Sequence, residues 1–330
     1  MNTFVRKPTR SDRTKVSYEA RFKQLRARFS RDAGMGELTP DEVVAHLILL
    51  RPELSPRTWR NYKAATLYYL ETYHPQHTTA IAELTKYTSV GLTDRASRTS
   101  GRKIKQVPEA AWAAIKFSLL QRERRGHKYS RGLLTICEAT LLTGLRPVEW
   151  SFSEISTHAE DGRRILHVRN AKHSNGRANG PTREMYIDGL TDVEIGLLRE
   201  AIALSECADE AQAEKLQLAL KHELEAARGV DLSPHNRRQS SVTLYSFRHQ
   251  FIANAKQTFD DPVITAAVVG HYSTKTANEH YGKRRHGQTK VRVFPTESSV
   301  SAVHSRHLET YRDYIAQRGA QPGRSLEAST

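Results

Sequence analysis

Residues 244–281, LYSFRHQFIANAKQTFDDPVITAAVVGHYSTKTANEHY, contain the side chains around which we expect the fold and chemistry of this chain to form. Arg248 carries a rigid fork of donors that matches phosphate oxygens, and the imidazole of His271 exchanges protons near neutral pH. Tyr281 adds a hydroxyl that can act as a nucleophile. Together the three groups are suited to cleaving a phosphodiester.

The whole chain is strongly basic. Its 330 residues include 51 lysines and arginines against 36 aspartates and glutamates, which gives a formal charge of +15. Such an excess is expected of a protein that neutralises a polyanion, and the length suffices for about two domains. No apolar run approaches the ~20 residues of a membrane helix, and the basic start lacks a signal peptide's apolar core. We therefore expect a cytoplasmic, nucleoid-associated protein with no membrane partner.

The sequence lacks the patterns of metal and nucleotide sites. Cys137 and Cys207 lie far apart and neither belongs to a CxxC pair, which argues against zinc and against a disulfide framework. There is no GxxxxGK[ST] loop, no HExxH motif and no carboxylate cluster of the two-metal type. We predict no metal, no cofactor and a reaction independent of ATP.

The first part of the chain reads as a small helical domain. Residues 1–16 are expected to be a flexible basic arm, and residues 17–91 a helical DNA-binding domain. Two of its helices have clear start signals, a capping box over residues 39–42 and a Ser-Pro pair at 55–56. On the outward face of the second of these helices we expect three DNA contacts: Arg57, Arg60 and Lys63.

Residues 92–107 are nearly free of large apolar groups and read as a basic interdomain linker. We expect the linker to run along a phosphate backbone through Arg102, Lys103 and Lys105.

The remainder reads as a mainly helical domain with a small antiparallel sheet, over residues 108–297. Gly144 should end a helix, and Pro147 should begin a new one that places Arg146 and Glu149 on one face. Short strands are expected in residues 152–157, 163–174 and 182–188, with a further strand at 291–294. Asn-Gly pairs mark a hairpin loop between the second and third strands, with Lys172 at its edge.

Two stretches leave alternatives open. Residues 191–229 fit one long helix or two helices broken near residues 205–209. Residues 298–330 are expected to form a C-terminal helix and tail. The apolar face of this helix fits docking on a neighbouring protomer and folding back on its own domain equally well.

Five elements in order resemble the tyrosine recombinase/phage integrase family. They are TGLRPVEW at 143–150, Lys172 of the hairpin, YSFRH at 245–249, the Gly270–His271 pair and Tyr281. The resemblance implies a fold that is mainly α with a small antiparallel β-sheet. In that fold a helical core-binding domain and an α+β catalytic domain form a C-shaped clamp on DNA.

The same resemblance implies roles at the scissile phosphate. Arg146 and Arg248 would clamp its nonbridging oxygens, where negative charge spreads during phosphoryl transfer. Tyr281 would attack the phosphorus and form a 3′-phosphotyrosine. Lys172 would protonate the leaving 5′-oxygen, and His271 would donate to the phosphate or assist the nucleophile.

Two residues are given supporting roles, and one departs from the family pattern. Glu149 would hold Arg146 or its helix in place, and His249 would support the site rather than carry a proton. Tyr245 stands where the family usually has a histidine, and a phenol is a poorer proton acceptor at neutral pH. Either His271 takes over as base or Tyr245 acts only by positioning. Tyr272 is the rival nucleophile, but it directly follows the histidine, and Tyr281 is favoured.

These features predict a site-specific DNA recombinase that cleaves and rejoins strands to integrate, excise or resolve a mobile element. The expected partners are double-stranded DNA with specific recombination sites, a homo-oligomer, expected to be a tetramer, and an accessory DNA-bending protein. The alternatives are a catalytically impaired DNA-binding protein with the same fold, and a related telomere resolvase or type IB topoisomerase.

Overall fold

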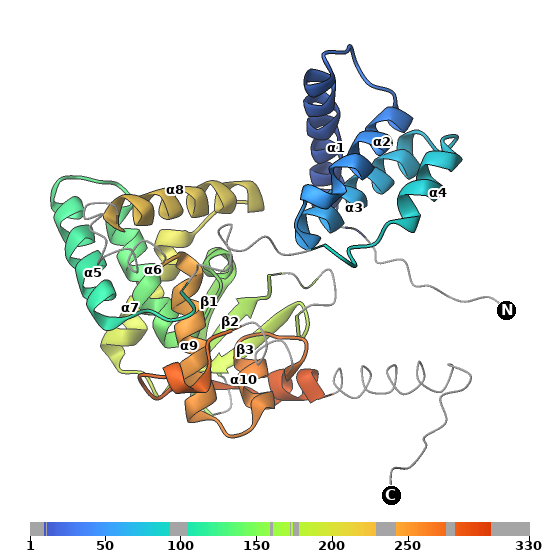
Figure 1. The fold of residues 1–330 in the computed structure, drawn as a ribbon. Helices are drawn as coiled ribbons and strands as arrows, with labels where there is room; N and C mark the ends of the chain where they lie inside the picture. The colour runs from blue at the N-terminus through green and yellow to red at the C-terminus, as the bar shows by residue number, and fades with distance from the viewer. Residues whose placement is uncertain are drawn as a thin grey trace, which may run out of the picture. The chain divides into compact units, whose positions relative to one another are not determined.

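The chain divides into two compact units, Met1–Arg102 and Lys103–Thr330. The computed structural model describes residues 10, 12–92, 104–158, 161–171, 173, 178–228, 242–274 and 281–304. Figure 1 shows the helices of the first unit in blue to cyan and the helices and sheet of the second in green to red. The prediction of a mainly helical chain with one small antiparallel sheet is confirmed.

The first unit is all helical in its described residues. Its elements are α1 (Asp12–Ala33), α2 (Pro40–Leu50), the short 3-10 helix η1 (Arg51–Glu53), α3 (Pro56–Tyr73) and α4 (Thr78–Lys86). The capping box at Thr39 and Glu42 is present, and the Ser55 side chain caps α3. These helices bury Phe22, Leu47 and Trp59 in one core.

The first helix begins earlier than the sequence analysis placed it. α1 starts at Asp12, so residues 12–16 belong to the helix rather than to the expected arm. Asp12 favours this start because an acidic side chain in the first turn complements the helix dipole, and it pairs with Lys15 at 2.7 Å.

The second unit is built around α6. Its longer helices are α5 (Glu109–Arg124), α6 (Ser130–Thr143), α7 (Asp192–Ser205), α8 (Glu210–Arg228), α9 (Leu244–Thr258) and α10 (Pro262–Val268). Helix α6 packs against α5, α7, α8 and α9 (Figure 1). The sequence left open whether residues 191–229 form one long helix or two. The structure has two, since α7 ends at Ser205 and α8 starts at Glu210.

Four antiparallel strands complete this unit in the order β1-β2-β3-β4. They are β1 (Ser153–Thr157), β2 (Arg164–Arg169), β3 (Thr182–Tyr186) and β4 (Phe294–Pro295). The first three match the predicted strands, whereas of the strand expected at 291–294 only Phe294 pairs, together with Pro295 beyond it. In this stretch Val291 and Val293 are buried in the main core.

The C-terminal helix begins on its own domain. Residues 297–304 are helical, and Val303 is buried in a small cluster with Val263, Ala266 and Ala267 of α10. The rest of the predicted helix, from residue 305, lies outside the described residues. Within the described part of the chain, no helix combines the length and apolarity needed to cross a membrane.

Gly144 is required both by its backbone conformation and by its packing. It ends α6 with a φ of +68°, and a Cβ built there would lie 2.1 Å from Cδ1 of Phe251. We expect Gly144→Ala to lower the free energy of unfolding by about 2–4 kcal/mol, from left-handed strain plus overpacking. Urea unfolding measures this loss.

Gly126 provides the matched control. Its φ is +82°, but nothing lies within 4 Å of a Cβ built there. We expect Gly126→Ala to cost only the backbone strain of about 1–2 kcal/mol. Equal losses for the two variants would contradict the packing argument.

Candidate active site

Arg146 and Glu149 form a closed pair at the start of the 3-10 helix η2 (Pro147–Phe152). The backbone N–H of Arg146 donates to Oε2 of Glu149 at 2.8 Å, and Nη1 donates to Oε1 at 2.5 Å. Both side chains are buried. The helix predicted to begin at Pro147 is thus a short 3-10 helix. It brings Arg146 and Glu149 together, as their spacing of three residues predicted.

Arg248, on α9, lies at the centre of this region with 0% of its surface exposed. Its Nη1 donates to the carbonyl of Gly144 at 2.5 Å, and its Nη2 donates to the carbonyl of Val269 at 2.7 Å. Nη1 also lies 3.8 Å from Oε2 of Glu149. The Nε group is buried and has no hydrogen-bond partner among the described residues. One donor of this guanidinium therefore remains unused.

His271 follows Gly270, whose φ of +65° turns the chain after α10. Its Nε2 lies 3.2 Å from Nη2 of Arg248, which can only donate, so Nε2 accepts and the ring proton sits on Nδ1. Nδ1 is buried without a hydrogen-bond partner in the described part of the chain. Burial, together with Arg248, lowers the pKa of His271 well below its ordinary value. The histidine is therefore neutral at pH 7, with an unused N–H donor.

The half-buried Tyr281 ring lies against this cluster. Its centroid is 4.7 Å from the His271 ring and 4.8 Å from the His249 ring. The Cζ atom of Arg248 lies 5.8 Å from the same centroid. The structure thus brings the predicted nucleophile next to His271, His249 and Arg248.

The segment after Tyr281 is held by side chains of α9. Lys256 donates to the carbonyl of Gly282 at 2.8 Å, and Gln250 donates to the carbonyl of His286 at 2.8 Å. Asn254 donates to Oγ1 of Thr289 at 2.9 Å. These contacts hold the segment that follows the predicted nucleophile. The sequence analysis missed them, although Gln250 and Asn254, four residues apart on one predicted helix, were a visible signal.

Tyr245 lies in the first turn of α9 and is 40% exposed. Burial raises the pKa of its phenol, while Arg146 and Arg248 act in the opposite direction. A phenol that stays protonated at neutral pH donates hydrogen bonds but is a weak proton acceptor. Of the two alternatives left open by the sequence, these properties favour a positioning role for Tyr245.

The sequence analysis did not find the third buried arginine of the cluster, Arg183 on β3. Its Nη2 donates to Oε2 of Glu149 at 2.8 Å, and both side chains are 0% exposed. The signal was present in TREMY, where the alternation of β3 places Arg183 on the buried face beside Met185. Arg146, Arg183 and Arg248 lower the pKa of Glu149 far below its ordinary value, although burial alone would raise it.

This arrangement predicts how stability depends on pH. The pKa of Glu149 is lower in the folded chain than its unfolded value of about 4.3, so its stabilisation is complete above about pH 5. It is lost as the pH falls toward the folded-state pKa. We expect Glu149→Gln to lower the free energy of unfolding by about 3–5 kcal/mol at pH 7, because it leaves buried cations unpaired.

Denaturant unfolding of wild type and Glu149→Gln between pH 4 and 8 tests this expectation. The difference between the two proteins should be constant from about pH 6 to 8 and should shrink below about pH 4.5. A difference that grows on acidification would show that Glu149 is not the anion of this cluster.

Lys172, the predicted general acid, lies outside the described residues. The base of its hairpin is described, and it is tied to the cluster. The backbone N–H of Ala171 donates to Oε1 of Glu149 at 3.1 Å. Asn170 is buried and donates to Oδ1 of Asn179 at 2.9 Å and to the carbonyl of Gly180 at 3.0 Å.

The predicted DNA contacts differ in their surroundings. Arg57, Arg60 and Lys105 are exposed, whereas Arg102 and Lys103 lie outside the described residues. Lys63 does not point its ammonium outward as expected. It donates to the carbonyls of Thr85 at 2.8 Å and Tyr87 at 2.6 Å, because these groups at the end of α4 lack helical partners.

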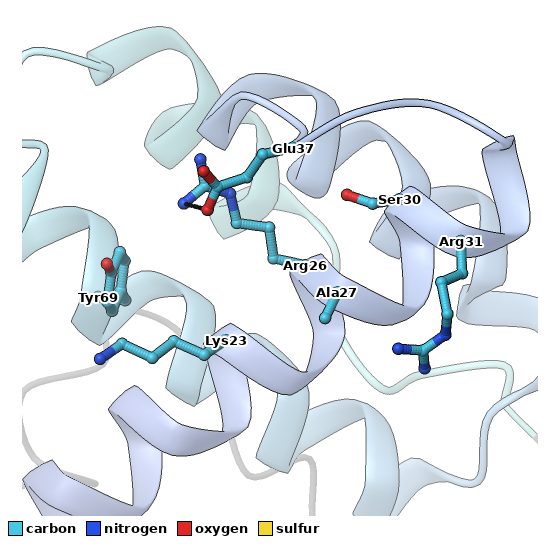
Figure 2. A pocket seen from close by; sticks show the side chains of 7 residues that line it. All are labelled: Lys23, Arg26, Ala27, Ser30, Arg31, Glu37 and Tyr69. Atoms are coloured by element: carbon cyan, nitrogen blue, oxygen red, sulfur yellow. Dashed lines mark ion pairs between the residues drawn. The ribbon is translucent and has the colours of Figure 1, made fainter.

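Surface hollows in the first unit are lined by further basic residues. One of about 720 Å³ lies along α1, and Figure 2 shows Lys23 and Arg31 at opposite ends of it. Between them Arg26 pairs with Glu37 at 2.6 Å. A second hollow, of about 540 Å³, is lined by Arg21 and Arg57. Neither hollow includes a residue of the buried arginine cluster.

No family model and no curated protein matches the sequence. Solved structures that match this chain include a lambda integrase tetramer bound to a Holliday junction, with 16% identity and a TM-score of 0.47. That match covers 87% of this chain and 76% of the other. A mutant protelomerase complexed with a DNA hairpin product matches with 14% identity and a TM-score of 0.43, covering 94% of each chain.

XerA recombinase matches with 13% identity and a TM-score of 0.33, covering 89% of this chain and 98% of the other. These similarities are low, so the function of the chain is inferred below from its own side chains.

Proposed function

We propose that this chain is a tyrosine-type DNA strand transferase that acts as a site-specific recombinase through a 3′-phosphotyrosyl intermediate. One observation carries the proposal. Three buried guanidinium groups, those of Arg146, Arg183 and Arg248, meet a single buried carboxylate, that of Glu149, and a half-buried phenol lies against the cluster.

The positive charge of the three arginines in this cluster exceeds the negative charge of the Glu149 carboxylate. Among the described residues, three cations against one carboxylate leave a net charge of +2 in a buried region, where unpaired charge is costly. Burial, followed by the neighbouring Arg146, lowers the pKa of Arg248 to about 10. A phosphodiester brings one negative charge, and its transition state spreads more charge over the nonbridging oxygens. Binding a phosphate would therefore relieve the imbalance.

The unused donors are suited to that phosphate. Nε of Arg248 and Nδ1 of His271 are both buried and lack partners among the described residues. Donors that are held in place before the reaction stabilise developing charge most effectively. In this proposal Arg146 and Arg248 clamp the nonbridging oxygens, and the neutral His271 donates its N–H to one of them.

Tyr281 supplies the nucleophile. Its oxygen attacks the phosphorus in line as the bond to the 5′-oxygen breaks, and its proton leaves to solvent, because nearby guanidinium charge favours the phenolate. Lys172 protonates the departing 5′-oxygen. The phosphotyrosyl bond retains the energy of the broken diester, so the reverse attack by a 5′-hydroxyl rejoins the strand without ATP.

The burial of Arg248 implies a movement on binding. The Tyr281 ring lies over a guanidinium that has 0% of its surface exposed. A phosphate therefore reaches Arg248 only if the ring shifts aside, toward the position from which it attacks. We propose that DNA binding drives this shift.

The wider assignment follows from the same proposal. The partners would be double-stranded DNA with specific sites, further copies of the chain assembled as a tetramer, and an accessory DNA-bending protein. The two units would close on DNA as a clamp, and the outcome would be integration, excision or resolution of a mobile element.

A nicked substrate tests the reaction. DNA that the protein prefers is first selected from a random duplex library, and a nick is then placed near each candidate cleavage point so that the cut strand diffuses away. We expect a covalent protein–DNA complex that forms in EDTA and resists detergent. A protein that only binds DNA would give none. Recombinant products from two sites separate a recombinase from a resolvase, which yields hairpin ends, and from a topoisomerase, which relaxes supercoils.

A further inference from the structure

We propose that Arg183 is a positioning residue that holds three segments of the active site in register. This inference rests on the proposed function and adds to it a residue that acts through others. The side chain of Arg183 is 0% exposed and lies on the buried face of β3, where it pairs with Glu149.

Each nitrogen of the Arg183 guanidinium donates to a different segment. Nε donates to the carbonyl of Val268 at 3.1 Å. Nη1 donates to Oδ1 of Asn170, and Nη2 donates to Oε2 of Glu149 at 2.8 Å. The planar guanidinium fixes the angles between these three hydrogen bonds. One side chain therefore sets the spacing of the three segments that carry the acceptors.

Each of those segments leads to a residue of the proposed site. Val268 comes three residues before His271, and Asn170 comes two residues before Lys172. Glu149 holds Arg146 through two hydrogen bonds and also accepts from the N–H of Ala171, beside the proposed general acid. A shift of Arg183 would therefore displace the first arginine, the hairpin and the histidine together.

The packing at Gly270 leaves little room for such a shift. A Cβ built at Gly270 would lie 2.4 Å from Oδ1 of Asn170 and 2.9 Å from Nη1 of Arg183. The turn that leads to His271 therefore lies directly against the contact between Asn170 and Arg183. The histidine and the hairpin are fixed by the same contact.

Arg183 is not itself placed to bind the phosphate. All three of its nitrogens already donate to protein groups, in contrast to Arg248, whose Nε has no partner among the described residues. Its effect on the reaction is therefore expected to come through the groups that it holds.

The test is single-turnover cleavage of the nicked substrate at saturating DNA by Arg183→Lys. Lysine keeps the charge but cannot make three fixed bonds, and a misplacement of about 1 Å costs on the order of 10²-fold in rate. We expect cleavage to slow by about 10- to 100-fold, with DNA affinity within about threefold of wild type. Asn170→Ala, which removes one acceptor, is the milder second variant if Arg183→Lys does not fold.

A substrate with sulfur in place of the bridging 5′-oxygen distinguishes positioning from a loss of folded protein. A thiolate leaves without being protonated, so this substrate bypasses the general acid. We expect it to restore part of the rate lost in Arg183→Lys, because the hairpin that carries Lys172 is displaced. A smaller folded fraction would lower both rates equally.

Arg122→Lys is the matched control. Arg122 is partly buried, and it pairs with Glu223 at 2.7 Å, between α5 and α8. We expect this variant to lose stability but to keep its cleavage rate at a temperature where it is folded.

Three results would overturn the inference. The first is cleavage by Arg183→Lys at the wild-type rate. The second is a cleavage rate that Arg183→Lys loses equally on the ordinary substrate and on the substrate with bridging sulfur. The third is a loss in Arg122→Lys as large as that in Arg183→Lys. If wild type itself forms no covalent complex, the proposed function fails and the inference fails with it, whereas an active wild type with an unaffected Arg183→Lys refutes only the inference.

Discussion

Replacing Tyr281 by phenylalanine is expected to slow covalent attachment to DNA by about 10⁴-fold or more, because removing a nucleophile leaves only the residual effect of the other groups. Phenylalanine keeps the ring that lies 4.7 Å from the His271 ring and 4.8 Å from the His249 ring. Only the hydroxyl is lost. Folding and DNA affinity should therefore change little.

The measurement is the yield of detergent-resistant complex on the nicked substrate, with DNA affinity followed separately by gel shift. Tyr272→Phe is the matched control, since it removes the hydroxyl of the rival tyrosine. We expect this control to form the complex at close to the wild-type rate. Attachment that persists in Tyr281→Phe and disappears in Tyr272→Phe would move the nucleophile to Tyr272.

Arg248→Ala is expected to lower the single-turnover cleavage rate by about 10²- to 10³-fold, the usual cost of one lost transition-state donor. The substitution removes the unused Nε donor and the hydrogen bond to Nε2 of His271. It also opens a space beside the carbonyls of Gly144 and Val269. Some loss of stability is therefore expected as well, and the rate must be measured where the variant is folded.

A neutral substrate separates charge stabilisation from general disruption. A methylphosphonate at the scissile position carries no negative charge, so its reaction depends less on the arginine. We expect it to recover part of the rate lost in Arg248→Ala. A wild-type rate on ordinary DNA would remove Arg248 from the site, and equal losses on both substrates would assign it a structural role only.

The sequence predicted the ends of some helices and strands correctly and those of others wrongly. Thr39 and Glu42 marked the start of α2, because a capping box involves only neighbours along the chain. Gly144 marked the end of α6 for the same reason. The alternation of polar and apolar residues located β1, β2 and β3. The start of α1 was misplaced, because the ion pair of Asp12 with Lys15 was not weighed.

The cluster could be predicted only in part. Motif order indicated Arg146, Arg248, His271 and Tyr281, and the structure brings these residues together, with Glu149 between the two arginines. Motif order gave no indication that Arg183 would donate a hydrogen bond to Glu149, which lies 34 positions away in the sequence. Nor did helical spacing show that the ammonium of Lys63 would turn to the carbonyls at the end of α4.

Most of the helices, the three main strands, the basic charge and the kinds of side chain available for phosphate chemistry could be predicted from the sequence alone. Caps, left-handed glycines and alternation act between neighbours, so they can be recognised in the sequence. The tertiary structure alone shows that three guanidinium groups share one carboxylate, and that Arg248 and His271 each keep a donor with no partner in the described part of the chain. Burial and hydrogen-bond partners depend on which distant segments pack together, and that packing fixes the balance of charge at the site.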